Sequence, residues 1–418
     1  MVSFSAADEI VSVMAAVRVI FLVVGSLLAV SAWKRLPSWI GPAVLAVVAL
    51  VVRVAPLGAA RSAGHNLADP IAFLLLAVPL AVLLDQSGFF VALAAMLGAT
   101  KHLLLGLWVL AALVTIVFNL DAAVVLLTPL FVRIAERQGR DPVAFGFIPA
   151  LLASLASSVL PVSNLTNLIV ADRFHLGFLD FVEHLGLPTL AAVIVGGWMF
   201  ARCSGGQFAT TPTADRSRHS SADNADAADA AALRVGYPVV AWLLIGFVIG
   251  EQIGVPEWAV VAIALVALAL RQRSLPWRHV PVQAAVLAVG LGILATAAAR
   301  HLPVEQLLSI RGIPGELATV GVMAVSSNAI NNLPALLVTL PGLDAHHDQI
   351  WSVLLGVNLG PTLWVTGALS TLLWQATMSR LGHPVSAIRY ARTAVRVGAP
   401  AIIAAAAVQA GLVLLTRT

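Results

Sequence analysis

The sequence predicts an all-α polytopic membrane protein, and three observations lead to that fold class. Of the 418 residues, 60% are hydrophobic and 11% are charged, whereas soluble domains average roughly 45–50% and about 25%. Apolar runs recur along nearly the whole chain. Most charged residues stand in short segments between those runs. We therefore expect about 12 membrane elements, each a full, tilted or broken helix.

The apolar runs give the expected elements in order. They cover residues 10–30, 39–57, 70–84, 102–118, 143–160, 186–201, 236–250, 258–270, 282–299, 316–330, 350–366 and 394–415. The first run follows Asp8 and Glu9 instead of a basic region, and no small-residue cleavage site is evident. It is therefore expected to remain as a membrane helix and not to be a secretory signal.

The charge pattern excludes some functions. The net charge is +4, but the basic residues stand in short loops, which is the pattern of the positive-inside rule and not of nucleic-acid binding. The basic residues around Arg202 and Arg234 favour a cytoplasmic linker and cytoplasmic termini, whereas Lys34 and Arg35 after the first apolar run favour an external N-terminus. A single cysteine, Cys203, excludes an intramolecular disulfide and a multi-thiolate metal site. We expect no resident metal or cofactor.

One long polar segment divides the chain. Residues Arg202 to Arg234 are rich in Ala, Ser and Asp and contain Gly205, Gly206 and Pro212, a composition typical of flexible linkers. The expected domains are a membrane repeat at 1–202, a linker at 203–234 and a second membrane repeat at 235–418. The linker is either an inert connector or a docking segment.

The two halves resemble each other weakly. In the first half, "FNLDAAVVLLTPLF" (118–131) precedes "LPVSNLTNLI" (160–169); in the second, "AINNLPALLVTLPGL" (329–343) precedes "LWVTGALSTLLW" (363–374). Each half therefore has an Asn-bearing turn before an apolar run and then a polar break. This order predicts two repeats of the kind found in transporters.

The polar breaks are the first candidate site. Pro161 disrupts a helix in an apolar run, and backbone that leaves a helix at membrane depth must be buried in protein or line a wet cavity. The polar groups are either contacts between helices or part of a substrate site between the repeats, and their pairing favours the site. They are Ser163, Asn164, Thr166 and Asn167 in the first break and Thr366, Ser370 and Thr371 in the second.

Asp121 is the sharpest single candidate. It lies between two apolar stretches, and an acid at membrane depth is a functional candidate by default. We expect it to couple transport to protons; the alternative is a loop residue that caps a helix starting at Ala122. Asp85 ends another apolar run and is either a helix end or a second functional acid.

Asparagines before apolar runs complete the candidate site. Asn331 or Asn332 can cap a helix that contains Pro334 in its first turn, and such a helix start points free N–H groups at a ligand. Further polar residues either extend this surface or pack between helices. They are Asn119, Ser327, Asn328 and Asn358.

Five stretches resemble the bacterial arsenite permease family, the ArsB-type arsenical pump membrane proteins of a broader ion-transporter superfamily. They are "LLDQSGFF" (83–90), "NLDAAVVLLTP" (119–129), "VSNLTNLIVADRFHLGF" (162–178), "SSNAINNLPALLV" (326–338) and "NLGPTLWVTGALSTLLW" (358–374). The resemblance implies two inverted repeats, each with a re-entrant hairpin and a discontinuous helix. Asn119–Asp121 and Asn331–Asn332 would lie near the hairpin tips, and 163–167 and 366–371 would form the helix breaks.

That family exports arsenite or antimonite in exchange for protons, and some members associate with an arsenite-stimulated ATPase subunit. The resemblance therefore implies a multi-pass antiporter of the cell inner (plasma) membrane that confers arsenical resistance. Its substrate would be the neutral trihydroxy species, which hydroxyl and amide groups can bind. Some members carry an acid where this chain has Ser154 and Asn358, so coupling here is expected either to rely on Asp121 or to have a different stoichiometry.

Two other functions stay open. A carboxylate or sodium-linked transporter of the same superfamily is one, although the polar breaks offer few basic residues for a dianion. An intramembrane enzyme is the other. The sequence has no paired-carboxylate metal motif, zinc-ligand His spacing or nucleophile elbow, so the protein is expected not to be an enzyme.

Overall fold

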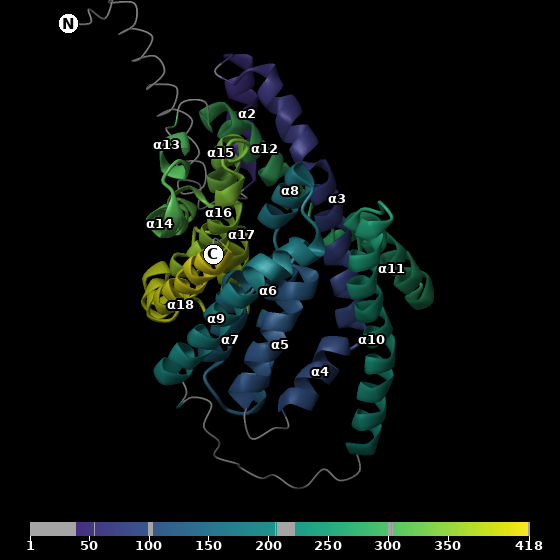
Figure 1. The fold of residues 1–418 in the computed structure, drawn as a ribbon. Coiled ribbons are helices and arrows are strands. Elements are labelled where there is room, and N and C mark those ends of the chain that lie inside the picture. Colours follow the sequence, from purple (N-terminus) through teal and green to yellow (C-terminus); the bar gives the residue numbers. More distant parts are fainter. Residues whose placement is uncertain are drawn as a thin grey trace, which may run out of the picture.

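A computed structural model describes residues 39–53, 55–98, 103–204, 206, 222–299, 302 and 304–416. In this part of the chain all regular structure is helical, and no strand occurs (Figure 1). The expected helix at 10–30 lies outside the described residues, as does most of the polar segment between residues 205 and 221.

The helices of the first half end at residue 204. They are α2 (Ile40–Val51), α3 (Leu57–Gln86), α4 (Phe89–Gly98), α5 (Leu103–Phe118), α6 (Leu120–Arg137), α7 (Pro142–Leu155), the 3-10 helix η1 (Pro161–Ser163), α8 (Leu165–Phe174) and α9 (Phe178–Ser204).

The second half starts with a helix that includes part of the polar segment. Its elements are α10 (Ala222–Gln252), α11 (Glu257–Gln272), η3 (Trp277–His279), α12 (Val282–Ala299), α13 (Val304–Leu308), α14 (Gly312–Ile330), α15 (Asn332–Leu343), η4 (His347–Gln349), α16 (Ile350–Leu359), η5 (Gly360–Leu363), α17 (Leu369–Arg380) and α18 (Ala387–Thr416). The division into two repeats and a linker stays a prediction.

Five helical segments in the described residues are long and apolar enough to cross a membrane. They are Ala63–Gln86, Phe178–Ser204, Asp229–Gln252, Trp277–Ala299 and Ala387–Leu415. Every expected apolar run within the described residues also contains a helix. The chain is therefore a multi-pass, all-helical membrane protein, which confirms the broad fold class. An inverted arrangement of its halves stays a prediction.

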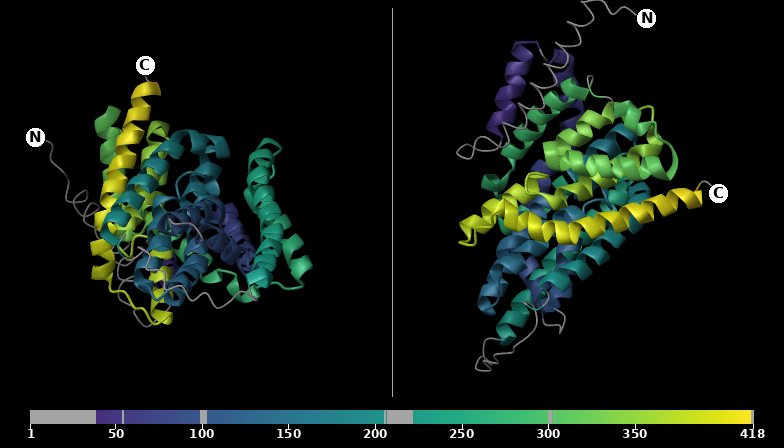
Figure 2. Two further views of the ribbon diagram at one scale, coloured as in Figure 1. Left: turned by 90° about the horizontal axis from the view of Figure 1, so that it is seen from below. Right: turned by 90° about the vertical axis from the view of Figure 1, so that its left-hand side faces the viewer.

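The long helices surround shorter, interrupted ones. α9 and α18 pack along each other, while α3 contacts α8, α11 and α12. α10 and α11 form a hairpin at one edge of the molecule (Figures 1 and 2). The helices α6, α8, α15 and α17 meet inside this frame, where their first residues line one cavity. Their non-helical junctions can therefore carry polar groups.

Candidate functional site

Two helices begin on the same unusual backbone. Asn119 precedes α6 with φ 97° and ψ 150°, and Asn331 precedes α15 with φ 79° and ψ 152°. This region is nearly restricted to glycine and costs of order 1–3 kcal/mol for other residues, which is characteristic of functional sites.

Each asparagine caps the helix that follows it. The Oδ1 atom of Asn119 accepts from the N–H of Asp121 at 2.9 Å, and that of Asn331 accepts from the N–H of Leu333 at 3.3 Å. The expected cap at Asn331 is confirmed. The alternative that Asp121 caps a helix starting at Ala122 is wrong, because Asp121 lies within the first turn of α6.

The break between η1 and α8 exposes carbonyl groups that two side chains satisfy. Ser163 Oγ lies 2.7 Å from the carbonyl oxygens of both Ser157 and Leu160. Asn167 Nδ2 donates to the same two oxygens at 2.9 and 2.8 Å. Pro161 starts the 3-10 turn and Asn164 caps α8 through the N–H of Thr166. Ser163 and Asn167 therefore hold the break in shape.

Asn358, at the end of α16, joins this break to the second half. Its Oδ1 atom accepts from Asn164 Nδ2 at 2.9 Å and from Thr166 Oγ1 at 2.6 Å. Its Nδ2 atom donates to Asn167 Oδ1 at 2.6 Å. All four side chains are buried, so these hydrogen bonds form in a low-dielectric environment where an unpaired partner is costly.

The break between η5 and α17 is hydrogen-bonded to the two asparagines at the start of α15. Its N-cap is Ala368, whose side chain makes no cap. The N–H of Asn332 donates to the carbonyl of Gly367 at 2.9 Å, and Asn331 Nδ2 donates to the carbonyl of Thr366 at 3.3 Å. The start of α15 and the second break are therefore one connected unit.

A cavity of about 40 Å³, the inner cavity, lies where both helix starts and both breaks meet. Its polar lining consists of Asp121, Asn164, Thr166, Asn331 and Asn332. Its apolar lining is Leu74, Leu120, Leu165, Ala284, Leu287, Ala288, Leu291, Leu333, Ala368 and Leu369. The structure thus brings together polar residues from both halves, which the sequence predicted to share one site.

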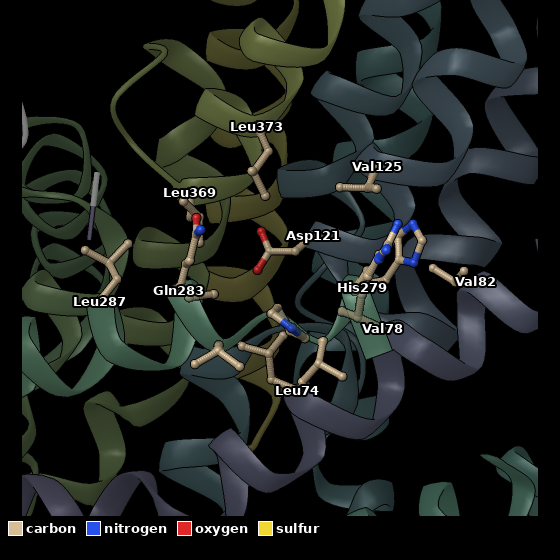
Figure 3. A pocket seen from close by; sticks show the side chains of 15 residues that line it. Leu74, Val78, Val82, Asp121, Val125, His279, Gln283, Leu287, Leu369 and Leu373 are labelled. Carbon is tan, nitrogen blue, oxygen red and sulfur yellow. The ribbon is translucent and has the colours of Figure 1, made fainter. Parts of the chain in front are cut away.

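An open cavity of about 410 Å³, the outer cavity, adjoins the inner one. Asp121 lines both, and its carboxyl group stands in the middle of the outer cavity, between Gln283 and His279 (Figure 3). Arg278 also lines the outer cavity. The Oδ1 atom of Asp121 is buried and accepts no hydrogen bond from a described residue.

Several predicted residues do not line the inner cavity. Asn119 acts as a helix cap, Ser163 and Asn167 hold the first break, and Thr366 and Thr371 bond to the carbonyl oxygens of Asn328 and Ala368. The others outside its described lining are Asp85, Ser327, Asn328, Asn358 and Ser370. Asp85 lies in the last turn of α3, as expected for a residue at a helix end.

The sequence reading missed two features. Arg278 is one of the basic residues between apolar runs and His279 follows it, and both line the outer cavity. Glu316, 1% exposed in α14, accepts a hydrogen bond from Ser352 Oγ. A lone acid at the start of an apolar run was the available signal for Glu316. It belongs to the described lining of neither cavity.

The described residues contain no group of three or more His, Cys, Asp or Glu side chains that could hold a metal ion. The site instead consists of amides, one hydroxyl, one carboxyl group and the starts of several helices, whose N–H groups carry partial positive charge. This chemistry suits binding and proton exchange more than bond making.

Comparison with known proteins decides the family. A sequence profile described as citrate transporter (CitMHS) matches residues 9–373, most of the chain. The chain belongs to the citrate transporter family.

Relatives of this family member include proteins named for arsenic. The chain is 29% identical over 354 residues to an arsenical pump membrane protein of Yersinia enterocolitica, and the match covers 77% of this chain and 81% of the relative. It is 28% identical over 392 residues to one of Escherichia coli, covering 85% and 89%. A 46 kDa membrane protein of Mycobacterium leprae is 23% identical over 351 residues, covering 78% and 82%.

These matches confirm the resemblance found in the sequence. The family and its named relatives are transporters and membrane pumps. This citrate transporter family member is therefore an ion transporter of the membrane and not an enzyme.

Proposed function

We propose that the protein exports arsenite or antimonite across the cell inner membrane in exchange for protons. One observation carries the proposal: Asp121 is the only ionisable residue in the described lining of the inner cavity, and it also lines the open outer cavity. A single carboxyl group at this junction can exchange a proton with water on one side and respond to a solute on the other.

The inner cavity suits a small neutral polyhydroxy solute. Near neutral pH arsenite is an uncharged trihydroxy species, so it needs hydrogen-bonding partners and no cation. Asn164, Thr166, Asn331 and Asn332 provide amide and hydroxyl groups. A volume of about 40 Å³ holds on the order of three water molecules, which is enough for a solute of a few heavy atoms.

Proton exchange supplies the driving force in this proposal. A neutral solute gains nothing from the membrane potential by itself. Exchange for one proton draws on about 2.3 kcal/mol per 100 mV, which corresponds to a roughly fifty-fold concentration ratio. An arsenite-stimulated ATPase subunit, which some arsenite permeases use, is not needed for this exchange.

Carboxylate transport is the second candidate, because the family profile is described as citrate transporter and Arg278 lines the outer cavity. Against it, no described residue lining the inner cavity is positively charged. A tricarboxylate is also too large for that cavity in this conformation. The outer cavity, at about 410 Å³, has room for one.

The experiment is an efflux assay in bacterial cells that lack their own arsenite exporter. Cells expressing the full chain should contain less arsenite than cells with empty vector, and an uncoupler should abolish the difference. A parallel arm measures uptake of labelled citrate. Unchanged intracellular arsenite at normal expression, together with citrate uptake, would replace the first candidate by the second.

A further inference from the structure

A groove runs along the outer edge of the molecule, away from both cavities. It lies between α10 and α11, the hairpin at the edge in Figure 1 and in the left view of Figure 2, and has a volume of about 490 Å³. Its apolar lining is Val235, Pro238, Val239, Trp242, Ile263, Ala264, Ala267 and Leu268. Arg234 and Arg271 complete it.

The two arginines lie at the same end of the hairpin. Arg234 precedes the end of α10 at Gln252 by 18 residues, or about 27 Å of helix, and Arg271 is in the last turn of α11. Glu251 and Glu257 flank the turn at the other end. Since the hydrocarbon core is about 30 Å thick, the arginines and the turn belong to opposite surfaces of the membrane.

Both guanidinium groups are available for a ligand. Arg234 and Arg271 are exposed, and neither is in an ion pair with a described residue. Two cations that share one groove without an acid create a positive potential that favours an anion.

The rest of the groove faces lipid. The membrane span in α10 is only 22% buried within the protein, against 61% for the span in α3. Trp242 and Ile263 are 43% and 53% exposed. Trp242 Nε1 donates to the carbonyl of Val260 at 3.0 Å, so the indole is fixed to α11 and forms a stable wall.

We propose that this groove binds an anionic phospholipid, with an acyl chain along the apolar wall and the phosphate between Arg234 and Arg271. Basic residues mark the cytoplasmic ends of membrane helices, and the cytoplasmic leaflet carries the anionic lipids. The arginine end of the groove is therefore at the surface where this ligand is abundant.

Charge argues against a second copy of the chain as the occupant. A two-fold interface places the same surface of both copies together, so arginines of both copies would approach one another without an acid from the groove. Free phosphate is also a poor occupant, because it leaves the apolar wall unused. A phospholipid matches both parts of the groove.

The test uses the purified full chain in neutral detergent. Native mass spectrometry and thermal unfolding are recorded with phosphatidylglycerol, phosphatidylcholine or inorganic phosphate. Each arginine near an anionic surface contributes roughly fivefold in affinity. We therefore expect the variant R234Q/R271Q to bind phosphatidylglycerol roughly thirtyfold more weakly, while phosphatidylcholine binding stays unchanged.

Two further variants make the result specific. R392Q/R396Q removes two exposed arginines from α18 and should leave phosphatidylglycerol binding as it is. Ala267→Phe fills the groove and keeps both cations, so it should also weaken lipid binding. Three results would overturn the proposal. One is an equal loss of phosphatidylglycerol binding in R392Q/R396Q, and another is equal protection against thermal unfolding by inorganic phosphate. The third is a dimer that R234Q/R271Q dissociates without any change in lipid binding.

Discussion

The helix starts at Asn119 and Asn331 have the same backbone conformation and differ in one functional group. Both asparagines have positive φ and cap the following helix through the N–H two residues later. That residue is Asp121 in the first half and Leu333 in the second, and both line the inner cavity. The shared backbone conformation therefore brings a helix start from each half to the inner cavity, and only one half adds an acid.

The two breaks differ in a complementary way. In the first, side chains satisfy the backbone, with Asn164 as the cap of α8. In the second, Ala368 offers no cap, and Asn331 and Asn332 bind the carbonyls of Thr366 and Gly367 instead. The first half thus carries the acid, and its break is stabilised by its own side chains. The break of the second half is stabilised by hydrogen bonds from the start of α15.

The largest effect is expected from Asp121→Asn, which leaves neither helix start with an ionisable group in the inner cavity. The variant keeps the shape of the side chain and removes the only ionisable group in the described lining of the inner cavity. Arsenite efflux driven by a pH gradient should fall to the level of vesicles without the protein. Everted membrane vesicles with an imposed gradient provide the measurement.

Glu316→Gln is the matched control for that prediction. It also converts an acid to its amide, and Glu316 is buried but belongs to the described lining of neither cavity. Efflux by this variant should stay within about twofold of wild type at equal expression. Normal gradient-driven efflux by Asp121→Asn would remove Asp121 from the mechanism.

The next test moves the acid to the other helix start, in the double variant Asp121→Asn/Leu333→Asp. Leu333 lines the inner cavity but is absent from the described lining of the outer one. The new acid therefore lacks the open path to water, and efflux should stay below a tenth of wild type. Size-exclusion chromatography checks folding, because a buried acid costs at least about 2.5 kcal/mol. Restored efflux would mean that the position of the acid does not matter.

Local sequence signals located most of the site. Pro161 and the polar residues after it identified the first break, and asparagines before apolar runs identified both helix starts. These signals succeed because a membrane-depth helix tolerates few polar residues, so each exception is informative.

Contacts between residues far apart in the chain could not be predicted from the sequence. The hydrogen-bond partner of Asn164 and Asn167 from the second half is Asn358, more than 190 residues away. The second break, at Ala368, lines the same inner cavity as Asn164. Arg278 and His279 belong to the outer cavity because η3 contacts α3, and residues of α3 and α6 line the same cavity. A loop cation and a cavity cation have the same local pattern.

A moderate effect is expected from Asn358→Ala, which removes the hydrogen bonds that Asn358 makes between the two halves. It leaves Asn164 Nδ2, Thr166 Oγ1 and Asn167 Oδ1 without this partner. Unpaired buried polar groups cost about 1–3 kcal/mol each, and water can replace some of the bonds. We therefore expect the free energy of unfolding to fall by about 2–4 kcal/mol.

Thermal unfolding in detergent measures this loss, with Ser154→Ala as the control. Ser154 stands one residue before the end of α7, as Asn358 does in α16, and its buried Oγ has no hydrogen-bond partner among the described residues. Removal of an unpaired hydroxyl should change stability by less than about 0.5 kcal/mol. Equal losses in the two variants would show that the contacts of Asn358 add nothing between the halves.

The smallest effect concerns the backbone that the two helix starts share. Asn119→Gly loses a cap but relieves a conformation that favours glycine, so it should stay within about 0.5 kcal/mol of wild type. Asn331→Gly also loses the hydrogen bond to the carbonyl of Thr366, so it should be less stable by about a further 0.5–1.5 kcal/mol. Asn119→Ala and Asn331→Ala lose the cap and retain the strain, so each should be about 1–3 kcal/mol less stable than its glycine counterpart. Thermal unfolding of the four variants gives the differences. If the glycine and alanine variants are equally stable at one position only, then the two helix starts do not share the positive-φ backbone conformation. Asp121 would then not be the main difference between the halves.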